Sequence, residues 1–197
     1  MAAHGAGPAP GGGMNEIASK WQLRSEFLRR AVVCVPLILL LGFASGQLVA
    51  SGSQNGWYRM LQQPPVGPPE WAFPVVWSIL YVLLGLALAI VLSARGARGR
   101  GVAIGLFVVQ MVLNLIWSPL FFGAHQVTAA LFVVVALFFV ALATTFAFGR
   151  IRPLAAWLLV PYLVWLVMAS ALNWQIDRRN PNAETLVPPA HSTQIAL

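Results

Sequence analysis

Residues 72–94 read AFPVVWSILYVLLGLALAIVLSA, a run that contains no charged side chain. A helix needs about 20 mostly apolar residues to cross the hydrocarbon core of a bilayer, so this run predicts a membrane-spanning helix. Runs of the same kind lie on both sides of it, at about 31–50, 102–122, 127–148 and 154–176. The sequence therefore predicts an all-α integral membrane protein, a bundle of five transmembrane helices in a single domain over residues 31–176.

The composition of the whole chain also indicates a membrane protein. Of its 197 residues, 59% are hydrophobic and 9% are charged, whereas soluble domains carry roughly 25% charged residues. The net charge of +7 does not indicate a nucleic-acid partner, because Lys and Arg lie in short clusters between apolar runs and not on a solvated face. Residues 1–30 are interpreted as a disordered, basic N-terminal segment and residues 177–197 as a polar C-terminal tail.

The basic residues divide unequally between the two sides of the predicted bundle. Nine lie on the side of the N-terminus: Lys20, Arg24, Arg29, Arg30, Arg95, Arg98, Arg100, Arg150 and Arg152. Three lie on the other side: Arg59, Arg178 and Arg179. Cytoplasmic loops of membrane proteins carry the excess of Lys and Arg, so the N-terminus is predicted to be cytoplasmic and the C-terminus to lie outside.

Short breaks separate the last four spans, as at Arg150-Ile151-Arg152-Pro153. Breaks of this length predict that consecutive helices are antiparallel neighbours. Small residues also recur four positions apart, as Gly42 with Gly46, Gly85 with Ala89, and Gly101 with Gly105. Such pairs allow close approach of helices, either inside one bundle or, for the third span, in a homodimer.

The longest connection, residues 51–71, is unusual in composition. It contains Gly56-Trp57-Tyr58, then Pro64-Pro65 and Pro68-Pro69, and it ends at Trp71. Proline fixes φ and aromatic side chains anchor at membrane interfaces, so this loop is predicted to be stiff and held close to the bundle. Two interpretations fit the pattern equally: a Pro/Trp-rich lid over a site in the bundle, or a proline-rich connector within an aromatic interfacial belt.

The spans lack the groups that several kinds of chemistry require. The acidic residues and histidines all lie in tails, loops or span ends: Glu16, Glu26, Glu70, Asp177, Glu184, His4, His125 and His191. Ion-coupled transporters need ionisable groups in mid-membrane, and metal sites need clustered ligands, so both are disfavoured and no metal site is predicted. No Ser/His/Asp or Cys/His arrangement supports nucleophilic catalysis, and no cofactor is required.

The predicted interior instead holds large aromatic side chains and a few amides. Three helical faces carry them: Gln110, Asn114, Trp117 and Phe121 on the third span, Tyr162, Trp165, Ala169 and Asn173 on the fifth, and Trp77 with Tyr81 on the second. An unpaired amide is costly in lipid, so Asn114 and Asn173 are predicted to point into the bundle. These faces form either helix–helix contacts joined by amide hydrogen bonds, or an aromatic-walled slot with polar anchors for a small molecule.

Three motifs resemble one known family, the tryptophan-rich sensory proteins, also called translocator proteins or peripheral benzodiazepine receptors. The run WYRMLQQPPVGPPEW from Trp57 to Trp71, with Trp77 and Leu80-Tyr81, is similar to the first loop and second helix of that family. The end of the family's third helix is similar to Asn114, Trp117, Pro119, Phe121-Phe122-Gly123-Ala124 and Gln126. The family's fifth helix is similar to Pro161-Tyr162-Leu163, Trp165, Ala169 and Leu172-Asn173. The motifs occur in the family's order and, with the five spans, cover residues 31 to about 180.

The resemblance implies a five-helix bundle, often dimeric, whose pocket beneath the first loop binds porphyrins, isoquinoline or benzodiazepine-type drugs and, in some members, sterols. By motif position, the ligand-binding residues are Tyr58, Pro68, Trp77, Asn114, Trp117, Trp165 and Ala169. The position of Trp77 is tied in some bacterial members to light-dependent protoporphyrin breakdown, which makes Trp77 the one candidate catalytic residue.

The chain departs from the family pattern at two places. Gln63 stands where the family usually has Lys, and Val66 where it has Trp, so an anionic propionate of a porphyrin loses one partner. Trp174 and Gln175 stand where the sterol motif of animal members requires a Tyr, which argues against sterol recognition by that motif.

The function implied by the resemblance is a membrane receptor or regulator that binds porphyrins (tetrapyrroles) and related flat hydrophobic ligands, in contact with lipid in a bacterial cell (inner) membrane. Two alternatives stay open: a light-dependent porphyrin-degrading enzyme that uses the indole of Trp77, and a porphyrin or sterol transporter. The transporter requires a second access state, for which the sequence shows neither an inverted repeat nor a mid-membrane charge.

Overall fold

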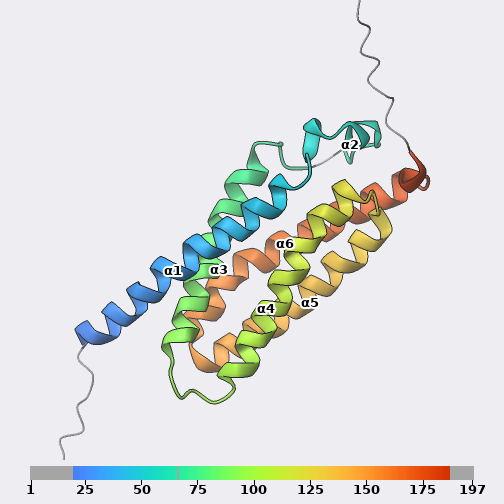
Figure 1. Cartoon of the computed structure of the whole chain (residues 1–197). Helices are drawn as coiled ribbons and strands as arrows, with labels where there is room; N and C mark the ends of the chain where they lie inside the picture. Colours follow the sequence, from blue (N-terminus) through green and yellow to red (C-terminus); the bar gives the residue numbers. More distant parts are fainter. Residues whose placement is uncertain (1–19, 66, 187–197) are drawn as a thin grey trace, which may run out of the picture.

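The computed structural model describes residues 20–65 and 67–186. Its long helices are α1 (Lys20–Gln47), α3 (Ala72–Ser93), α4 (Arg100–Ser118), α5 (Val127–Ile151) and α6 (Pro153–Arg179). All five are long and apolar enough to cross a membrane, which confirms the predicted five-helix membrane fold (Figure 1). The predictions for residues 1–19, for Val66 and for the tail beyond residue 186 lie outside the described residues.

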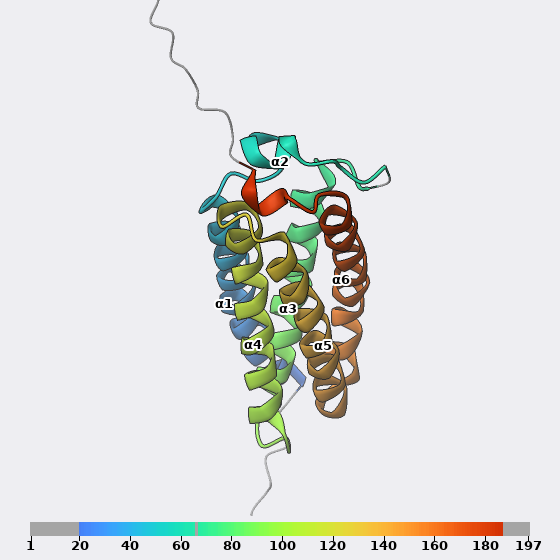
Figure 2. The ribbon, with the colours of Figure 1, turned by 90° about the vertical axis from the view of Figure 1, so that its right-hand side faces the viewer.

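Four short elements complete the described chain. The first loop contains the 3₁₀ turn η1 (Gly52–Gln54) and the helix α2 (Gly56–Met60). The π-helical turn η2 (Pro119–Gly123) extends α4, and the 3₁₀ turn η3 (Ala183–Thr185) follows α6. Figure 2 shows α2 lying across one end of the bundle, so the loop covers the ends of the long helices.

The five long helices form a ring. Around it α1 packs on α3, α3 on α6, α6 on α5 and α5 on α4, and α1 closes the ring against α4. Consecutive spans are therefore neighbours, as predicted, with one exception. The helices α3 and α4 touch each other only slightly, and α6 occupies the place beside α3.

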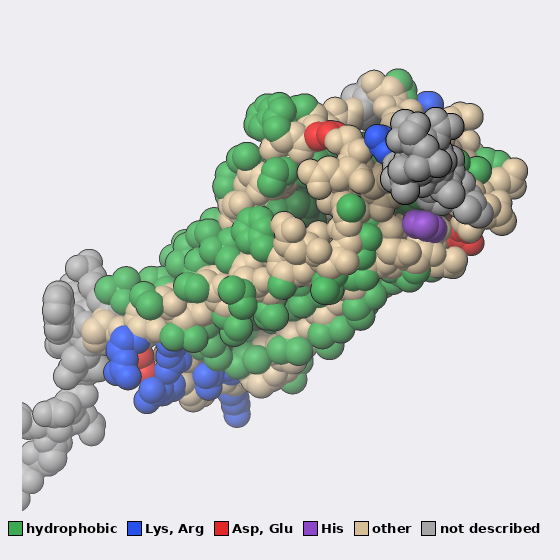
Figure 3. Space-filling view, turned by 45° about the horizontal axis from the view of Figure 1, so that its top comes forward, with side chains coloured by type: hydrophobic (Ala, Val, Ile, Leu, Met, Phe, Trp, Pro, Cys, Tyr) green, Lys and Arg blue, Asp and Glu red, His purple; other side chains and the backbone are tan. Residues whose placement is uncertain are grey.

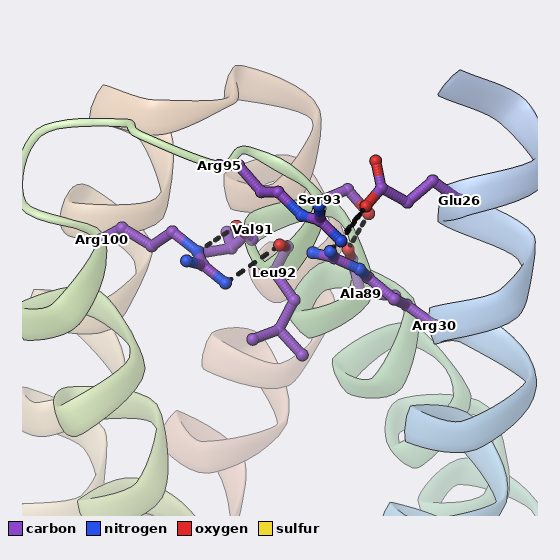
Figure 4. Close-up of polar contacts among 8 residues, drawn as sticks. All are labelled: Glu26, Arg30, Ala89, Val91, Leu92, Ser93, Arg95 and Arg100. Atoms are coloured by element: carbon purple, nitrogen blue, oxygen red, sulfur yellow. Dashed lines mark hydrogen bonds and ion pairs between the residues drawn. The ribbon is translucent and has the colours of Figure 1, made fainter. Parts of the chain in front are cut away.

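The first helix begins earlier than predicted, at Lys20, so residues 20–30 are helical and not disordered. Glu26 supports this part of the helix, because its Oε1 lies 2.9 Å from a guanidinium nitrogen of Arg30 one turn later. The same oxygen lies 2.6 Å from Arg95 in the connection between α3 and α4 (Figure 4). At the other end of the chain, α6 continues to Arg179 and takes in the first residues of the predicted tail.

Two glycines allow α1 and α3 to approach closely. A Cβ on Gly85 would lie 2.7 Å from the Cα of Val35, so only glycine fits at this contact. A Cβ on Gly42 would collide with the ring of Tyr81. The positions of Gly101 and Gly105 are different, since a Cβ there would meet no atom within 4 Å. That pair has no packing role in this bundle, and the homodimer stays a prediction.

The surface of the bundle is divided by charge. Figure 3 shows a belt of apolar side chains around the helices, with most Lys and Arg side chains gathered at the end away from the loop. Large apolar side chains such as Phe132, Phe139 and Val164 are mostly exposed on the belt. A bilayer covers such a belt, because helices satisfy their own backbone groups and present only apolar side chains to lipid.

Candidate ligand-binding site

Asn55 fixes the first loop to the bundle. Its side-chain oxygen accepts from the backbone N–H of Tyr58 at 3.0 Å and so caps helix α2. Its Nδ2 donates to the carbonyls of Ala50 at 2.8 Å and Phe122 at 3.1 Å. This single buried amide therefore ties α2 to the chain that leaves α1 and to the turn η2.

The chain after α6 holds the same loop from the other side. Trp57 is 1% exposed, and its Nε1 donates to the carbonyl of Ala183 at 2.8 Å. Its ring stacks on His125 with the ring centroids 4.5 Å apart. In addition, the backbone N–H of Gln62 donates to Oδ1 of Asn180 at 2.8 Å, and Nδ2 of Asn180 donates back to the carbonyl of Gln62 at 3.2 Å. The described part of the loop is thus held against the end of the bundle.

A cavity of about 620 Å³ lies beneath this loop, between the loop, the start of α3 and the end of α6. Small-molecule sites in proteins have volumes of roughly 300–1,000 Å³, so the cavity is large enough for a ligand of that class. Its apolar lining comes from Pro64, Pro65 and Pro68 of the loop, Phe73 of α3, and Leu172 and Ile176 of α6. Flat apolar surfaces therefore face the cavity from both the loop and the helices.

The polar side chains of the cavity differ in how they are paired. Glu70 accepts from the hydroxyl of Ser53 at 2.7 Å, and Gln63 donates through Nε2 to the carbonyl of Tyr58 at 3.0 Å. Arg59 also lines the cavity, but its side chain makes no ion pair or hydrogen bond with any residue that the structure describes. The cavity therefore has one cation available to a ligand.

The hydroxyl of Tyr58 is a neutral group at ordinary pH. Burial raises the pKa of Tyr58 above its usual value, and the negative charge of Glu70 raises it further. Ionisation of this phenol is therefore opposed on both counts. At neutral pH Tyr58 presents an O–H donor and an aromatic ring to the cavity.

Aromatic side chains of α3 and α6 form a packed layer below the cavity. Trp77 stacks on Tyr81 with centroids 5.2 Å apart, and it meets the edge of Trp165 at 6.2 Å. Trp165 in turn contacts Phe73 edge-on at 5.6 Å, and Phe73 lines the cavity. Trp77 itself does not line the cavity, and Phe73 and Trp165 connect it to the cavity wall.

Asn114, the first of the predicted polar anchors, lies between two tyrosines in this layer. Its Oδ1 accepts from the hydroxyl of Tyr81 at 3.1 Å, and its Nδ2 donates to the hydroxyl of Tyr162 at 3.2 Å. These bonds join α3, α4 and α6. The amide is already paired within the bundle, which favours the interpretation of this face as a helix–helix contact.

Trp117 and Asn173 form a second polar link between helices. The indole N–H of Trp117 donates to Oδ1 of Asn173 at 3.2 Å, and Nδ2 of Asn173 donates to the carbonyl of Val127 at 3.1 Å. Trp117 also stacks on Phe121, with centroids 5.1 Å apart. Ala169, one turn before Asn173 on α6, is partly buried against the same core. This link too is a contact within the bundle.

Gln110 is the exception among the interior amides. It is 0% exposed, and neither its Nε2 nor its Oε1 has a hydrogen-bond partner in the described part of the chain. Gln110 lies one turn before Asn114 on the same face of α4. An unpaired buried amide costs roughly 1–3 kcal/mol, so the two amides have opposite effects on the stability of the fold.

The structure separates the seven predicted ligand-binding residues into two groups. Tyr58 and Pro68 line the cavity, whereas Trp77, Asn114, Trp117, Trp165 and Ala169 lie in the packed layer below it. The cavity is also lined by residues that were not predicted to bind a ligand, among them Arg59, Glu70, Phe73 and Leu172. Helical spacing offered a signal for Leu172, which follows Ala169 by three residues and so shares its side of α6.

The sequence from within α1 to the end of α6 matches a known family. Residues 34–179 correspond to the TspO/MBR family. The chain belongs to this family. It is 40% identical over 150 residues to the tryptophan-rich protein TspO of Chlorobaculum tepidum, which covers 76% of this chain and 94% of that protein.

Other bacteria and animals have similar TspO/MBR proteins. The chain is 37% identical over 126 residues to the tryptophan-rich sensory protein of Cereibacter sphaeroides, covering 64% of this chain and 78% of that protein. It is 38% identical over 142 residues to the translocator protein of Homo sapiens, covering 71% of this chain and 84% of that protein. These matches confirm the resemblance read from the three motifs and make the chain a member of a membrane receptor and sensory protein family.

The residues matched to the TspO/MBR family include the loop, the cavity and the packed layer, but not all of the residues that hydrogen-bond to the loop. It ends at Arg179, the last residue of α6. Asn180 and Ala183, which hold the loop through Gln62 and Trp57, follow that point. The contacts that position the cover of the cavity therefore lie partly outside the matched residues.

Proposed function

We propose that this TspO/MBR protein is a membrane receptor that binds porphyrins (tetrapyrroles) and related flat hydrophobic ligands in the cavity beneath the first loop. The observation that carries this proposal is the lining of the cavity, which combines proline and aromatic side chains with an exposed cation, Arg59, that has no partner among the described residues. A flat macrocycle buries its faces against the apolar lining. A carboxylate at the edge of the macrocycle pairs with the guanidinium.

Arg59 answers a difficulty raised by the sequence. The position of Gln63 lacks the Lys that the family usually has, and Gln63 is bound to the carbonyl of Tyr58. Arg59 lines the same cavity and supplies the positive charge that Gln63 lacks. Glu70 repels a carboxylate, so the acidic edge of the ligand lies on the side of Arg59, and the apolar edge lies toward Phe73 and Leu172.

The test is a titration of the purified protein in detergent with protoporphyrin in the dark, followed by tryptophan fluorescence. Saturable quenching is expected, because eight tryptophans lie in the chain and a porphyrin in the cavity is close to those of α3 and α6. A titration without saturable quenching would contradict the proposal. The same samples under light distinguish a receptor from an enzyme. With a receptor, the porphyrin absorbance falls no faster than that of free porphyrin in detergent, whereas with an enzyme it falls faster.

We also propose that the protein lies in a bacterial cell membrane with its N-terminus in the cytoplasm. The support is the gathering of basic side chains at the end away from the loop (Figure 3). A reporter active only in the cytoplasm is expected to work when inserted at residues 95–99 between α3 and α4, and to fail when fused after residue 180. The reverse pattern would overturn this orientation and leave the cavity assignment untouched.

A further inference from the structure

A second cavity, of about 410 Å³, lies between α5 and α6 at the end of the bundle away from the loop. Phe146 and Arg150 of α5 and Trp157 of α6 line it. Gly149 and Ala156 line it as well, and a Cβ on Gly149 would lie 3.4 Å from that of Ala156. The helices are therefore close together at these small residues, and the larger side chains on either side of them make a groove.

The groove faces outward, toward lipid. The side chains of Phe146 and Trp157 are 67% and 71% exposed, so neither belongs to the core of the bundle. Arg150 lies in the last turn of α5, and Pro153 begins α6 directly after the turn. The groove therefore starts at the membrane surface, where an indole such as that of Trp157 prefers to lie, and continues toward the hydrocarbon core.

The basic residues at this end of the bundle are not equivalent. Arg30 and Arg95 share the carboxylate of Glu26, and Arg100 donates to two backbone carbonyls at the end of α3, at 3.2 and 3.0 Å (Figure 4). These arginines hold the fold together. The guanidinium groups of Arg98, Arg150 and Arg152 make no ion pair or hydrogen bond with any residue in 20–65 or 67–186, and of these three only Arg150 lines the groove. Its charge is therefore available to a ligand in the groove.

We propose that this groove binds one anionic phospholipid of the surrounding membrane. The headgroup phosphate pairs with the planar guanidinium of Arg150, which matches phosphate oxygens in a bidentate manner. An acyl chain lies along Gly149 and Ala156, between the aromatic rings of Phe146 and Trp157. A cation above an apolar groove that opens to lipid fits an amphiphile with an anionic head, whereas the choline cation of a zwitterionic lipid would be repelled by Arg150. This site is independent of the porphyrin cavity.

The test is native mass spectrometry of the full chain released from micelles that contain equal amounts of phosphatidylglycerol and phosphatidylcholine. The wild type is expected to retain one phosphatidylglycerol in preference to phosphatidylcholine. Arg150→Gln is expected to lower the retained phosphatidylglycerol about fivefold, the effect of one basic residue worth ~1 kcal/mol near an anionic head. Arg98→Gln is the matched control, because it removes the same charge at the same end and Arg98 does not line the groove.

A second pair of variants tests the apolar part of the site. Phe146→Ala and Phe132→Ala both remove an exposed phenyl ring from α5, where the two side chains are 67% and 72% exposed, but only Phe146 lines the groove. Neither change is expected to unfold the protein, and only Phe146→Ala is expected to lower retention. The proposal is wrong if Arg150→Gln acts no more strongly than Arg98→Gln, if Phe146→Ala acts no more strongly than Phe132→Ala, or if the wild type retains both lipids equally.

Discussion

The cavity beneath the loop and the aromatic layer below it lie one helical turn apart on α3, where Phe73 lines the cavity and Trp77 belongs to the layer. In the layer, the amide of Asn114 is paired with two tyrosine hydroxyls. In the cavity, the guanidinium of Arg59 is unpaired among the described residues. Paired polar atoms in the layer therefore serve stability, whereas the exposed and unpaired guanidinium at the cavity can serve ligand binding, so mutations should separate the two.

The largest effect is expected in the layer, on stability. Asn114→Ala leaves the hydroxyls of Tyr81 and Tyr162 without this partner, and it should lower the free energy of unfolding by about 2–3 kcal/mol. Thermal unfolding in detergent measures the loss. Thr128→Ala is the control, because its hydroxyl donates to Asp177 at 2.7 Å in an exposed position and should cost less than about 1 kcal/mol.

The opposite result at Asn114 would be informative. If Asn114→Ala left stability unchanged and abolished protoporphyrin binding, the amide would be a ligand anchor, and the boundary between layer and cavity would have to move below it. Equal losses of stability for Asn114→Ala and Thr128→Ala would show that the two buried hydrogen bonds contribute no more than an exposed one.

The second effect is a gain of stability at Gln110. Gln110→Met keeps the shape of the side chain and removes an amide that has no partner in the described residues. It should raise the free energy of unfolding by about 1–2 kcal/mol, the cost of leaving a buried polar group unpaired. A melting curve in detergent measures the gain, with Asn114→Ala as the comparison of opposite sign. A loss of stability in Gln110→Met would show that the amide is paired in the folded protein.

Much of the fold could be predicted because apolar length alone identifies a membrane span, and each predicted span overlaps one long helix. The start of α1 could not be predicted in this way. The contact of Glu26 with Arg95, which supports the first turns of α1, joins two residues far apart in the sequence. The contact between the loop and the chain after α6 could not be predicted either. Trp57 donates to the backbone carbonyl of Ala183, and every residue has such a carbonyl.

The candidate site could be predicted only in part, for a related reason. Helical spacing correctly placed Asn114 and Asn173 inside the bundle, where both are buried. A filled interior and an open pocket both require such inward faces, so spacing cannot distinguish them. What distinguishes them is whether each polar atom has a partner, and that depends on other helices. Arg59 was missed because α2 has five residues, too few for a periodicity that shows which way a side chain points.

The third effect concerns ligand affinity in the cavity. Arg59→Gln should weaken the binding of protoporphyrin about fivefold, because it removes the cation that pairs with a carboxylate. The dimethyl ester of protoporphyrin, which lacks the carboxylates, should bind both proteins equally. Tryptophan quenching measures both affinities. Arg179→Gln is the matched control at the same end of the bundle, since Arg179 does not line the cavity. An equal effect of Arg59→Gln on acid and ester would remove the role of Arg59 as an anion partner.

The smallest effect is expected at Trp77, and it also separates a receptor from an enzyme. Phe retains an aromatic face against Tyr81, and Trp77 does not line the cavity, so Trp77→Phe should change protoporphyrin affinity by no more than about threefold. Phe73→Leu, one turn away and in the cavity wall, should weaken binding more. For an enzyme, Trp77→Phe should nearly abolish light-dependent loss of porphyrin absorbance, because the redox-active indole is gone. For a receptor, the wild type and the variant should bleach porphyrin alike, at the rate of free porphyrin. If Trp77→Phe weakened binding more than Phe73→Leu did, the layer and the cavity would form one site.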